Sequence, residues 1–439
     1  MDAATCPVLD GFDPTSWEFF QDPYPLFARA RSERPVFFYP DGPFWVVTRY
    51  EDVERVITDF ETFSNHAFEL LRPPPELADR VPGNLAEWFE INNDPPAHTV
   101  SRKVLQRAFT RALVRQQELF ALRKAHELID SFIDDGRCDL TEQYASPLGL
   151  AVMVNLVGLP EEDIALYSRW SEALFALLAH RPWKAELDPH HQPGHALSAE
   201  DIRASWSLLA EEFDYLRAII DERRKDPRDD LVSAFLAVRD DEGNVVYGRD
   251  RIATEMAVLI EGGMETNATL MAQTILHLSR APEQFEQVKS DRSLVPNAVE
   301  EALRLRGSTW GIWRVARTDV QIAGVTVPEG SLILAMLASA ARDEQVFGCP
   351  NRLDIRRSNT DQHLSWGKGR HFCPGAPLAK MTNATSLNAI MDRIPNIRVP
   401  EQQLEYRKYL VTQQLLHLHC EWEASPLKAP PTTSTSASV

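Results

Sequence analysis

The chain has 439 residues, of which 44% are hydrophobic and 25% are charged, a composition typical of a soluble globular protein. Its formal net charge of −18 argues against general affinity for nucleic acid or for anionic membrane surfaces. The first residues lack the basic and apolar segments of a targeting peptide, and the most apolar stretch, LGLAVMVNLVGLP, is too short to span a bilayer. We therefore expect a cytoplasmic protein.

The predicted elements are mainly helical, with a smaller β portion drawn from both ends of the chain. The early part mixes helical segments such as DPYPLFARARSERP with the strand-like FWVVTRY. From about residue 97 to residue 306, apolar residues return every three or four positions, as in amphipathic helices. Further on, VQIAGVTVPEGSLILAML predicts short strands joined by turns at Gly324 and Gly330. No repeat or linker divides residues 1–424, which predicts one domain, and the Ser-, Thr- and Pro-rich residues 425–439 are expected to be disordered.

The segment NNDPPAHTVSRKVLQRAFTR predicts a helix that begins near Pro96 and carries several basic side chains. His98 and Arg102 lie four residues apart and therefore point the same way, as donors to one anionic ligand would. A solvated basic face is the default interpretation of such a pattern.

A long helix is predicted roughly from Arg249 to Arg280. Its middle carries Gly262 and Gly263, each of which costs about 1 kcal/mol of helix stability relative to alanine. Glu265 and Thr266, an acid beside a hydroxyl, follow immediately. The glycines could form a notch for helix packing with a solvated glutamate beside it, or they could let a flat ligand approach the backbone.

The next helix contains VEEALRLR, in which Glu301 and Arg304 share one face. Such a pair is usually a surface ion pair that contributes little to stability.

The segment SWGKGRHFCPGAPLAK, residues 365–380, connects these motifs. Its order Trp-Gly-x-Gly-x-His-x-Cys-x-Gly resembles the cysteine-ligand loop of the haem-thiolate monooxygenases, the cytochrome P-450 family, where the aromatic position is usually Phe. The segments DPPAHTVSR, GGMETN, EALR and WRVAR follow the order of that family's motifs. The resemblance covers almost the whole chain up to about Trp422.

The resemblance implies a cytochrome P-450 fold with a long central helix that crosses the molecule over a haem b cofactor. Cys373 would supply the thiolate ligand to the haem iron, in a loop shaped by Gly367, Gly369 and Gly375. Trp366 would place a larger ring with an N–H donor near the sulfur. The expected partners of the haem propionates are His98, Arg102, Arg314 and His371.

By the same resemblance, Glu265 and Thr266 are the catalytic pair that delivers protons during oxygen activation. Gly262 and Gly263 would give room for dioxygen and substrate over the haem. Glu301 and Arg304 would form an internal ion pair that supports the cysteine loop, a structural role.

The substrate pocket is the least determined part of the prediction. Its expected lining residues are Phe68, Leu71, Trp88, Phe175, Trp310 and Ile312. Many of these are apolar, which favours a small apolar organic substrate. We also consider that Glu261 anchors a substrate amine or hydroxyl; the alternative is a partnered or solvated helix carboxylate.

Electrons must come from a partner, because the chain has no flavin or NAD fingerprint and no Fe–S cysteine set. The basic residues from Arg102 to Arg111, with Lys368, Arg370 and Lys380, predict a docking face for a small acidic ferredoxin that is served by a separate NAD(P)H reductase. The expected function is a monooxygenase of secondary metabolism or catabolism. The alternative is a non-catalytic haem-binding or sensor protein, which would have no need of Glu265 and Thr266.

Overall fold

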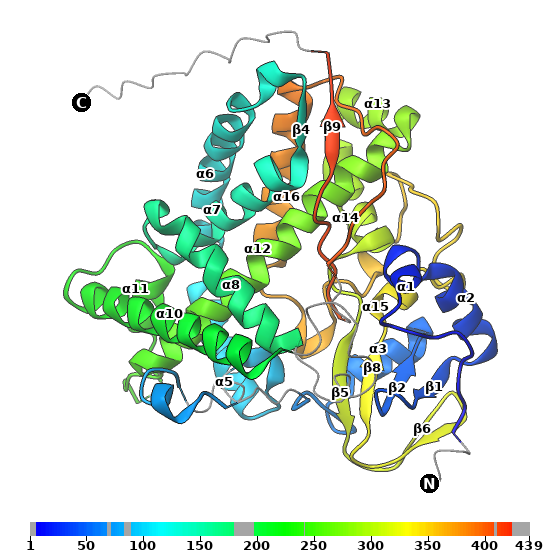
Figure 1. The fold of residues 1–439 in the computed structure, drawn as a ribbon, viewed down its shortest axis with the longest axis horizontal. Helices are drawn as coiled ribbons and strands as arrows, with labels where there is room; N and C mark the ends of the chain where they lie inside the picture. The colour runs from blue at the N-terminus through cyan, green and yellow to red at the C-terminus, as the bar shows by residue number, and fades with distance from the viewer. Residues whose placement is uncertain are drawn as a thin grey trace.

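The computed structural model describes residues 6–67, 72–82, 89–179, 197–240, 242–407 and 411–423. Helices make up most of it, as the sequence predicts (Figure 1). The helices are α1 Trp17–Gln21, α2 Tyr24–Glu33, α3 Tyr50–Thr58, α5 Ala97–Ala108, α6 Arg111–Asp130, α7 Ser146–Val157, α8 Ile164–Ala179, α10 Ala199–Lys225, α11 Leu231–Ala237, α12 Arg249–Ser279, α13 Pro282–Ser290, α14 Val295–Arg306, α15 Leu337–Ala340 and α16 Ala376–Arg393.

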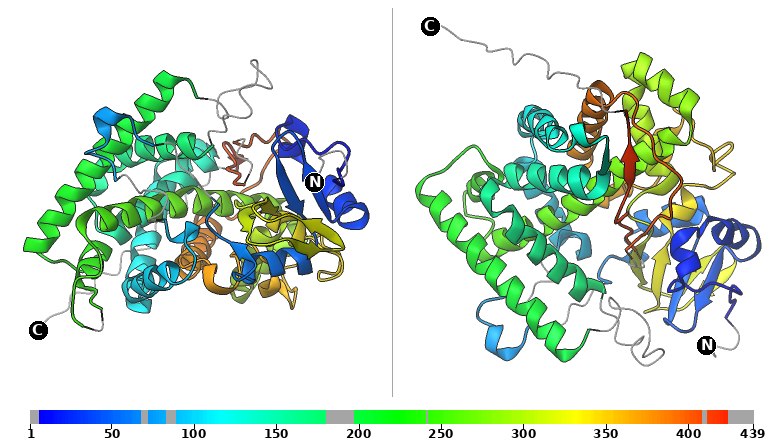
Figure 2. Two further views of the ribbon diagram at one scale, coloured as in Figure 1. Left: turned by 90° about the horizontal axis from the view of Figure 1, so that it is seen from below. Right: turned by 45° about the horizontal axis from the view of Figure 1, so that its top comes forward.

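The β portion comes from both ends of the chain, as predicted. The strands are β1 Val36–Tyr39, β2 Phe44–Val47, β3 Phe63–Ser64, β4 Arg137–Asp139, β5 Ile312–Ala316, β6 Val320–Ile322, β7 Val325–Val327, β8 Leu332–Ala335 and β9 His419–Glu421. The main sheet has the order β1-β2-β8-β5-β3, with β2 and β8 parallel and the other neighbours antiparallel. In both views of Figure 2 the early blue strands therefore lie beside the later yellow ones.

Two smaller β pairs complete the strands of the described residues. Strands β6 and β7 form a hairpin whose turn contains Gly324 at φ +79°, a left-handed conformation that glycine adopts without strain. Strand β4 pairs with β9, so the end of the described chain returns to the helical part of the molecule (Figure 1).

Helix α12 is the predicted long helix and ends one residue earlier than expected. Its 31 residues span about 46 Å at 1.5 Å per residue. It contacts α7, α10, α14 and α16, and most of its side chains are buried. A helix that is covered on several sides in this way has no single apolar stripe, and polar side chains such as Glu255, Asn267 and Gln273 are buried as well.

The apolar core is continuous around α12 and α7. Helix α7 is buried along almost its whole length, and Trp170, Trp206 and Phe213 from α8 and α10 belong to the same cluster. No helix in the described part of the chain is both long and apolar enough to cross a membrane. The single domain over residues 1–424 stays a prediction, and the expected disordered tail, 425–439, lies outside the described residues.

Candidate haem-binding active site

The cysteine loop lies between a short 3-10 turn, Gly369–His371, and helix α16. Backbone hydrogen bonds within the loop hold it as a tight turn. The N–H of Cys373 donates to the carbonyl of Trp366 at 2.8 Å. Gly367 and Gly369 have φ values of +71° and +69°, so any other residue would be strained there. The loop shape expected of these two glycines is present.

The sulfur of Cys373 lies at the start of α16, where two backbone groups point to it. Burial raises the pKa of the Cys373 thiol, while the N–H groups of Gly375 and Ala376 and the charge of Arg102 act in the opposite direction. A Cβ on Gly375 would come within 3.8 Å of the sulfur. Because N–H donors stabilise a thiolate and tune its donor strength, this environment suits a thiolate ligand of a metal.

The N–H of Trp366 was expected near the sulfur of Cys373 and instead contacts a glutamate. Its indole Nε1 donates to Glu300 Oε2 at 3.0 Å, so this N–H is not available to the sulfur. The same carboxylate binds His363 at 2.8 Å and Lys380 at 2.6 Å. Although burial opposes the shift, these partners lower the pKa of Glu300 to about 2. Glu300 therefore stays ionised and fixes the indole ring beside the cysteine loop.

The four predicted propionate partners come from three separate segments and include two neighbouring rings. His98 on α5 and His371 in the loop have ring centroids 4.0 Å apart. Both nitrogens of His371 are buried without a hydrogen-bond partner, and burial followed by the charge of neighbouring groups lowers its pKa to about 3. Arg314 on β5 is buried and donates to the carbonyl of Trp313, its one hydrogen-bond partner among the described residues, and burial lowers its pKa to about 10. Arg102 donates to the carbonyl of Phe372.

Buried donors without an acceptor are costly, and a pair of carboxylates would satisfy them. The residues present therefore fit a haem whose propionates lie between α5, β5 and the cysteine loop. The fit rests on the orphaned nitrogens of His371 and on the buried guanidinium of Arg314, which forms no ion pair within the described residues.

Glu90 belongs to this cluster and was missed by the sequence analysis. His98 Nε2 lies 2.9 Å from Glu90 Oε1, and Arg102 Nη1 lies 3.5 Å from the same atom. Although burial opposes the shift, His98, His371 and Arg102 lower the pKa of Glu90. Glu90 precedes the DPPAH motif by a few residues, and no local pattern distinguishes it from other glutamates.

The two glycines of α12 face different surroundings. A Cβ on Gly262 would meet no atom within 4 Å, as expected of a position that gives room to a ligand. A Cβ on Gly263 would lie 2.3 Å from the Sδ of Met153 on α7. The expectation for Gly263 is therefore corrected: its missing side chain allows the close packing of α7 against α12.

Thr266 and Glu265 follow on the same helix. The Thr266 hydroxyl donates to the carbonyl of Gly262 at 2.6 Å, the back-bond that the sequence analysis considered. Glu265 is buried, and its Oε1 lies 3.2 Å from Arg407 Nη1. Burial raises the pKa of Glu265 to about 7, even though Arg407 lowers it. Its carboxyl can therefore gain or lose a proton near neutral pH.

Glu261 lies one turn earlier and contacts the helices that cover α12. It is buried next to Glu212 of α10 and to Ser171 of α8. Burial raises its pKa well above the usual value, and Glu212 adds to the shift while the Ser171 hydroxyl opposes it. Burial also raises the pKa of Glu212 to about 8. These surroundings favour the partnered helix carboxylate over the substrate anchor.

Glu301 and Arg304 form a bidentate ion pair, with distances of 2.6 and 3.0 Å. Both side chains are fully buried, so the surface ion pair is the wrong interpretation. Arg357, which the sequence analysis missed, adds a third contact to Glu301 at 2.9 Å. Arg304 also donates to the carbonyls of Ala341 and Pro350. The cluster joins α14 to the chain that leads to the cysteine loop, in line with a structural role.

The expected substrate-pocket residues have different outcomes. Phe68, Leu71 and Trp88 lie outside the described residues, as does the side chain of Phe175 on α8. Ile312 is partly buried on β5 and stays a prediction.

Trp310 was expected in the pocket and lies in the core instead. It is fully buried and makes edge or tilted contacts with Phe19, Tyr24 and Phe27. These aromatic residues come from α1 and α2. The sequence did not predict that these two helices pack against the segment that follows α14. The prediction that Trp310 lines the substrate pocket is therefore corrected.

Comparison with known proteins agrees with this site. The family model "Cytochrome P450" matches residues 199–402. Cytochrome P450 monooxygenase PikC of Streptomyces venezuelae is 32% identical over 404 residues, which cover 90% of this chain and 89% of that protein. The 6-deoxyerythronolide B hydroxylase of Saccharopolyspora erythraea is 29% identical, over 92% and 97% of the two chains. Mycinamicin IV hydroxylase/epoxidase of Micromonospora griseorubida is 32% identical, over 86% and 89%.

The fold is equally similar to solved structures. Cytochrome P450 CYP109Q5 from Chondromyces apiculatus superposes with a TM-score of 0.81 and 29% identity, covering 94% of this chain and 98% of that one. The P450 haem domain of Tepidiphilus thermophilus gives a TM-score of 0.82 with 25% identity, over 95% and 97%. The chain belongs to the cytochrome P450 family of haem-thiolate monooxygenases, enzymes that use haem b, dioxygen and redox partners.

Proposed function

We propose that Cys373 is the thiolate ligand of haem b and that His98, Arg102, Arg314 and His371 hold its propionates. Bound haem with a thiolate ligand activates dioxygen, so that one oxygen atom can be inserted into an organic substrate. The observation that carries the proposal is the half-buried sulfur of Cys373 with its two N–H donors, beside the unsatisfied imidazole nitrogens of His371 and the buried guanidinium of Arg314.

Glu265 and Thr266 supply protons from the other side of the site. The carboxyl of Glu265, with its pKa raised to about 7, passes protons inward while Arg407 holds it in place. Thr266 keeps its hydroxyl on the carbonyl of Gly262, where the open space over that glycine admits dioxygen and substrate. Glu265 is buried and Thr266 half-buried, and the burial of Glu265 limits water, which would otherwise compete for the protons.

The proposed substrate is a small, largely apolar organic molecule of secondary metabolism, and the proposed reaction is its hydroxylation. Two relatives are named as hydroxylases, one of 6-deoxyerythronolide B and one of mycinamicin IV. The apolar segments of α8 and α12 supply the surface that such a substrate needs.

A spin-state titration tests the substrate class. Haem-loaded protein is titrated with a library of polyketide-derived and other apolar compounds, and a change in the haem absorption reports entry into the pocket. We expect saturable shifts with some apolar compounds and none with their charged, polar derivatives. A library in which only charged compounds shift the spectrum would contradict the proposal.

The proposed electron donor is a small acidic ferredoxin served by an NAD(P)H reductase, both in the cytoplasm. Lys103 lies on α5, Arg111 begins α6, and Arg370 lies in the 3-10 turn of the cysteine loop. Lys103 and Arg111 are exposed. Lys368 is partly neutralised by Glu54 and Lys380 by Glu300, so the first three carry the net charge of this face.

Charge reversal tests the docking face. Lys103→Glu should lower the rate of electron transfer from an acidic ferredoxin severalfold at low salt, and added salt should reduce the difference. Lys225→Glu, on the exposed end of α10, is the matched control and should leave the rate unchanged. Equal effects of the two substitutions, or no dependence on salt, would contradict docking at this face.

A further inference from the structure

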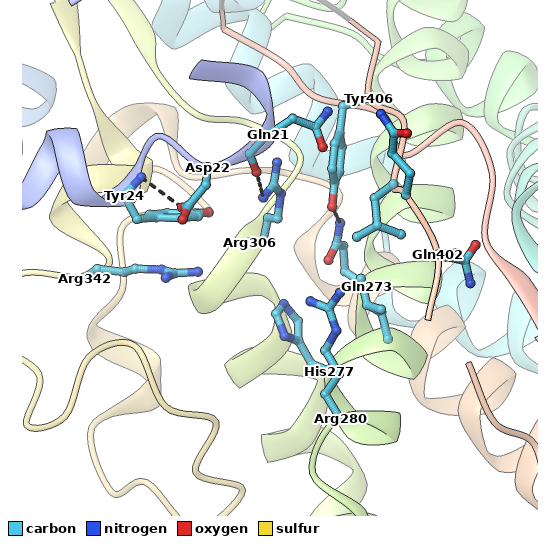
Figure 3. Close-up of a pocket in the computed structure, with 13 residues that line it drawn as sticks. Gln21, Asp22, Tyr24, Gln273, His277, Arg280, Arg306, Arg342, Gln402 and Tyr406 are labelled. Carbon is cyan, nitrogen blue, oxygen red and sulfur yellow. Dashed lines mark hydrogen bonds between the residues drawn. The ribbon is translucent and has the colours of Figure 1, made fainter. Parts of the chain in front are cut away.

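A polar pocket lies at the C-terminal end of α12, beyond Glu261 and Glu265 in the middle of that helix. Figure 3 shows its lining residues. It has a volume of about 420 Å³, within the range of small-ligand sites. Its walls are the residues between α1 and α2, the end of α12, the end of α14 and the segment 402–406. Gln273 lies seven residues beyond Thr266, or about 10 Å along the helix. None of its lining residues belongs to the haem site.

The pocket has an excess of positive charge. Arg280, Arg306 and Arg342 line it, and Asp22 is the one acid among its lining residues. His277 adds no charge near neutral pH, because burial, followed by the charges of Arg342, Arg280, Arg306 and Arg304, lowers its pKa to about 3. The lining residues therefore carry a net charge of +2.

Within the described residues, Arg306 and Arg342 donate hydrogen bonds to neutral acceptors. Arg306 donates to the carbonyl of Gln21 at 2.9 Å and to that of Phe20 at 2.8 Å. Arg342 donates to the carbonyl of Leu305 through two nitrogens. Within the described residues, neither of these guanidinium groups, nor that of Arg280, forms an ion pair with a carboxylate. Asp22 is near these groups but balances only part of their positive charge.

Aromatic rings fix the planes of two of these groups. The guanidinium carbon of Arg342 lies 3.3 Å from the ring centroid of Tyr24, and that of Arg306 lies 3.9 Å from the ring of Tyr406. Stacking of this kind reduces the side-chain entropy that an arginine loses when it binds a ligand. Figure 3 shows both tyrosines beside the arginines in the pocket.

Several buried polar atoms of the lining have no hydrogen-bond partner among the residues that the structure describes, which is rare in a folded protein. They are Gln21 Nε2, Tyr24 Oη, Gln273 Oε1, His277 Nε2 and Arg306 Nε. Tyr24 is 8% exposed and Gln273 is 0% exposed, so bulk water does not satisfy them. Three of the five atoms, on Gln21, Tyr24 and Arg306, are donors, as an oxyanion requires.

We propose that this pocket binds the phosphate group of a small phosphate monoester. Such a group carries a charge of about −2 at neutral pH and presents three acceptor oxygens. The net charge of +2 balances it, and the unpaired donors of Gln21, Tyr24 and Arg306 match its oxygens. The volume exceeds that of phosphate alone and leaves room for the esterified part. A dicarboxylate has similar charge, and the test below separates the two.

Calorimetry of the haem-loaded full chain in a phosphate-free buffer at fixed ionic strength tests the proposal. The probes are glycerol 3-phosphate, inorganic phosphate and succinate. Arg280→Gln removes an exposed cation of the pocket, and Asp22→Asn removes its acid; neither side chain is buried. Arg356→Gln is the matched control, an exposed arginine that donates to Gln287 and lies outside the pocket.

We expect one glycerol 3-phosphate per chain. Arg280→Gln should weaken its affinity about tenfold, as for the loss of one charge-assisted contact. Asp22→Asn should strengthen it about threefold, and Arg356→Gln should leave it unchanged. Binding of succinate alone, with the same pattern among the variants, would overturn the assignment to phosphate. Absence of binding by every probe, or equal weakening by Arg356→Gln and Arg280→Gln, would overturn the site itself.

Discussion

The middle and the end of helix α12 belong to two polar sites with opposite chemistry. In the middle, Glu261 is buried near Glu212 and Glu265, and burial raises the pKa of each of the three carboxyls. At the end, His277 is buried among arginines, and its pKa is lowered to about 3. In both places burial favours the neutral form of the group, and charges of the same sign add to the effect.

The two sites differ in which of their groups stay charged near neutral pH. Burial favours the protonated carboxyls of Glu212, Glu261 and Glu265, and we propose that Glu265 exchanges its proton with the haem site. The arginine pocket keeps its cations, because guanidinium groups do not lose their proton, and so it attracts an anion. One helix thus carries a site suited to proton transfer and a site suited to anion binding. The predictions below test this contrast.

The largest expected effect is on proton transfer by Glu265. Glu265→Gln should lower the rate of product formation about 100-fold, because a positioned acid-base group typically contributes that much or more. The fraction of electrons lost as hydrogen peroxide should rise, measured per NAD(P)H oxidised with a substrate found by the spin-state titration.

Glu172→Gln is the control for this effect, since Glu172 is exposed and acts on Glu265 only through its charge. It should retain the wild-type rate within about twofold. A Glu265→Gln variant that couples electrons to product as well as the wild type would remove Glu265 from the proton path.

The second effect concerns stability at alkaline pH. Burial raises the pKa of Glu212 from 4.5 to about 8, so the folded state binds its proton more tightly than the unfolded state. The resulting stabilisation is complete below pH 4.5 and is lost as the pH rises toward 8. Glu212→Gln should reduce this loss of stability between pH 4.5 and 8. At pH 8.5 it should raise the free energy of unfolding by on the order of 3 kcal/mol.

Thermal unfolding of the haem-loaded protein between pH 5 and 8.5 measures this decline. Glu211→Gln, the exposed neighbour on α10, should behave as the wild type. Parallel profiles for the wild type and Glu212→Gln would show that Glu212 titrates normally.

The third effect is a loss of stability at acid pH, and it concerns His277 near the C-terminal end of α12. The pKa of His277 is lowered from 6.5 to about 3, so its contribution to stability is present above pH 6.5 and is lost as the pH falls toward 3. His277→Gln should flatten the acid decline and gain on the order of 2 kcal/mol relative to the wild type at pH 5. The exposed His419→Gln serves as control in the same unfolding series. If both variants keep the wild-type slope, His277 does not titrate as argued.

The smallest effect is a shift of a pH profile. Arg407 lowers the pKa of Glu265, so Arg407→Gln should raise that pKa further above its usual range. The pH at which product formation declines should therefore move upward by about one unit, with Arg398→Gln as the exposed control. A shift to lower pH would contradict the assignment of Arg407 as the partner of Glu265.

The sequence predicted best what is local. The Cys373 loop, its left-handed glycines and the Glu301–Arg304 pair each lie within a few residues. Their spacing predicted that these residues meet, and the family resemblance predicted that the ion pair is internal. The same holds for the ends of α12, whose periodic pattern is long.

The sequence predicted poorly what depends on distant segments. Arg357 reaches Glu301 across 56 residues and Arg407 reaches Glu265 across 142. Glu261 was considered as a substrate anchor, because the sequence of its own helix does not predict a contact with Glu212 of α10. For the same reason adjacent glycines cannot be told apart in sequence, although Gly262 meets open space and Gly263 meets Met153.

The most direct test of the account is the absorption spectrum of the reduced protein with carbon monoxide, for the wild type and for Cys373→His. The account predicts a strongly red-shifted Soret band for the wild type, as a thiolate ligand gives, and a band without that shift for the variant. A red-shifted band that survives in Cys373→His, or its absence from haem-loaded wild type, would contradict thiolate ligation by Cys373.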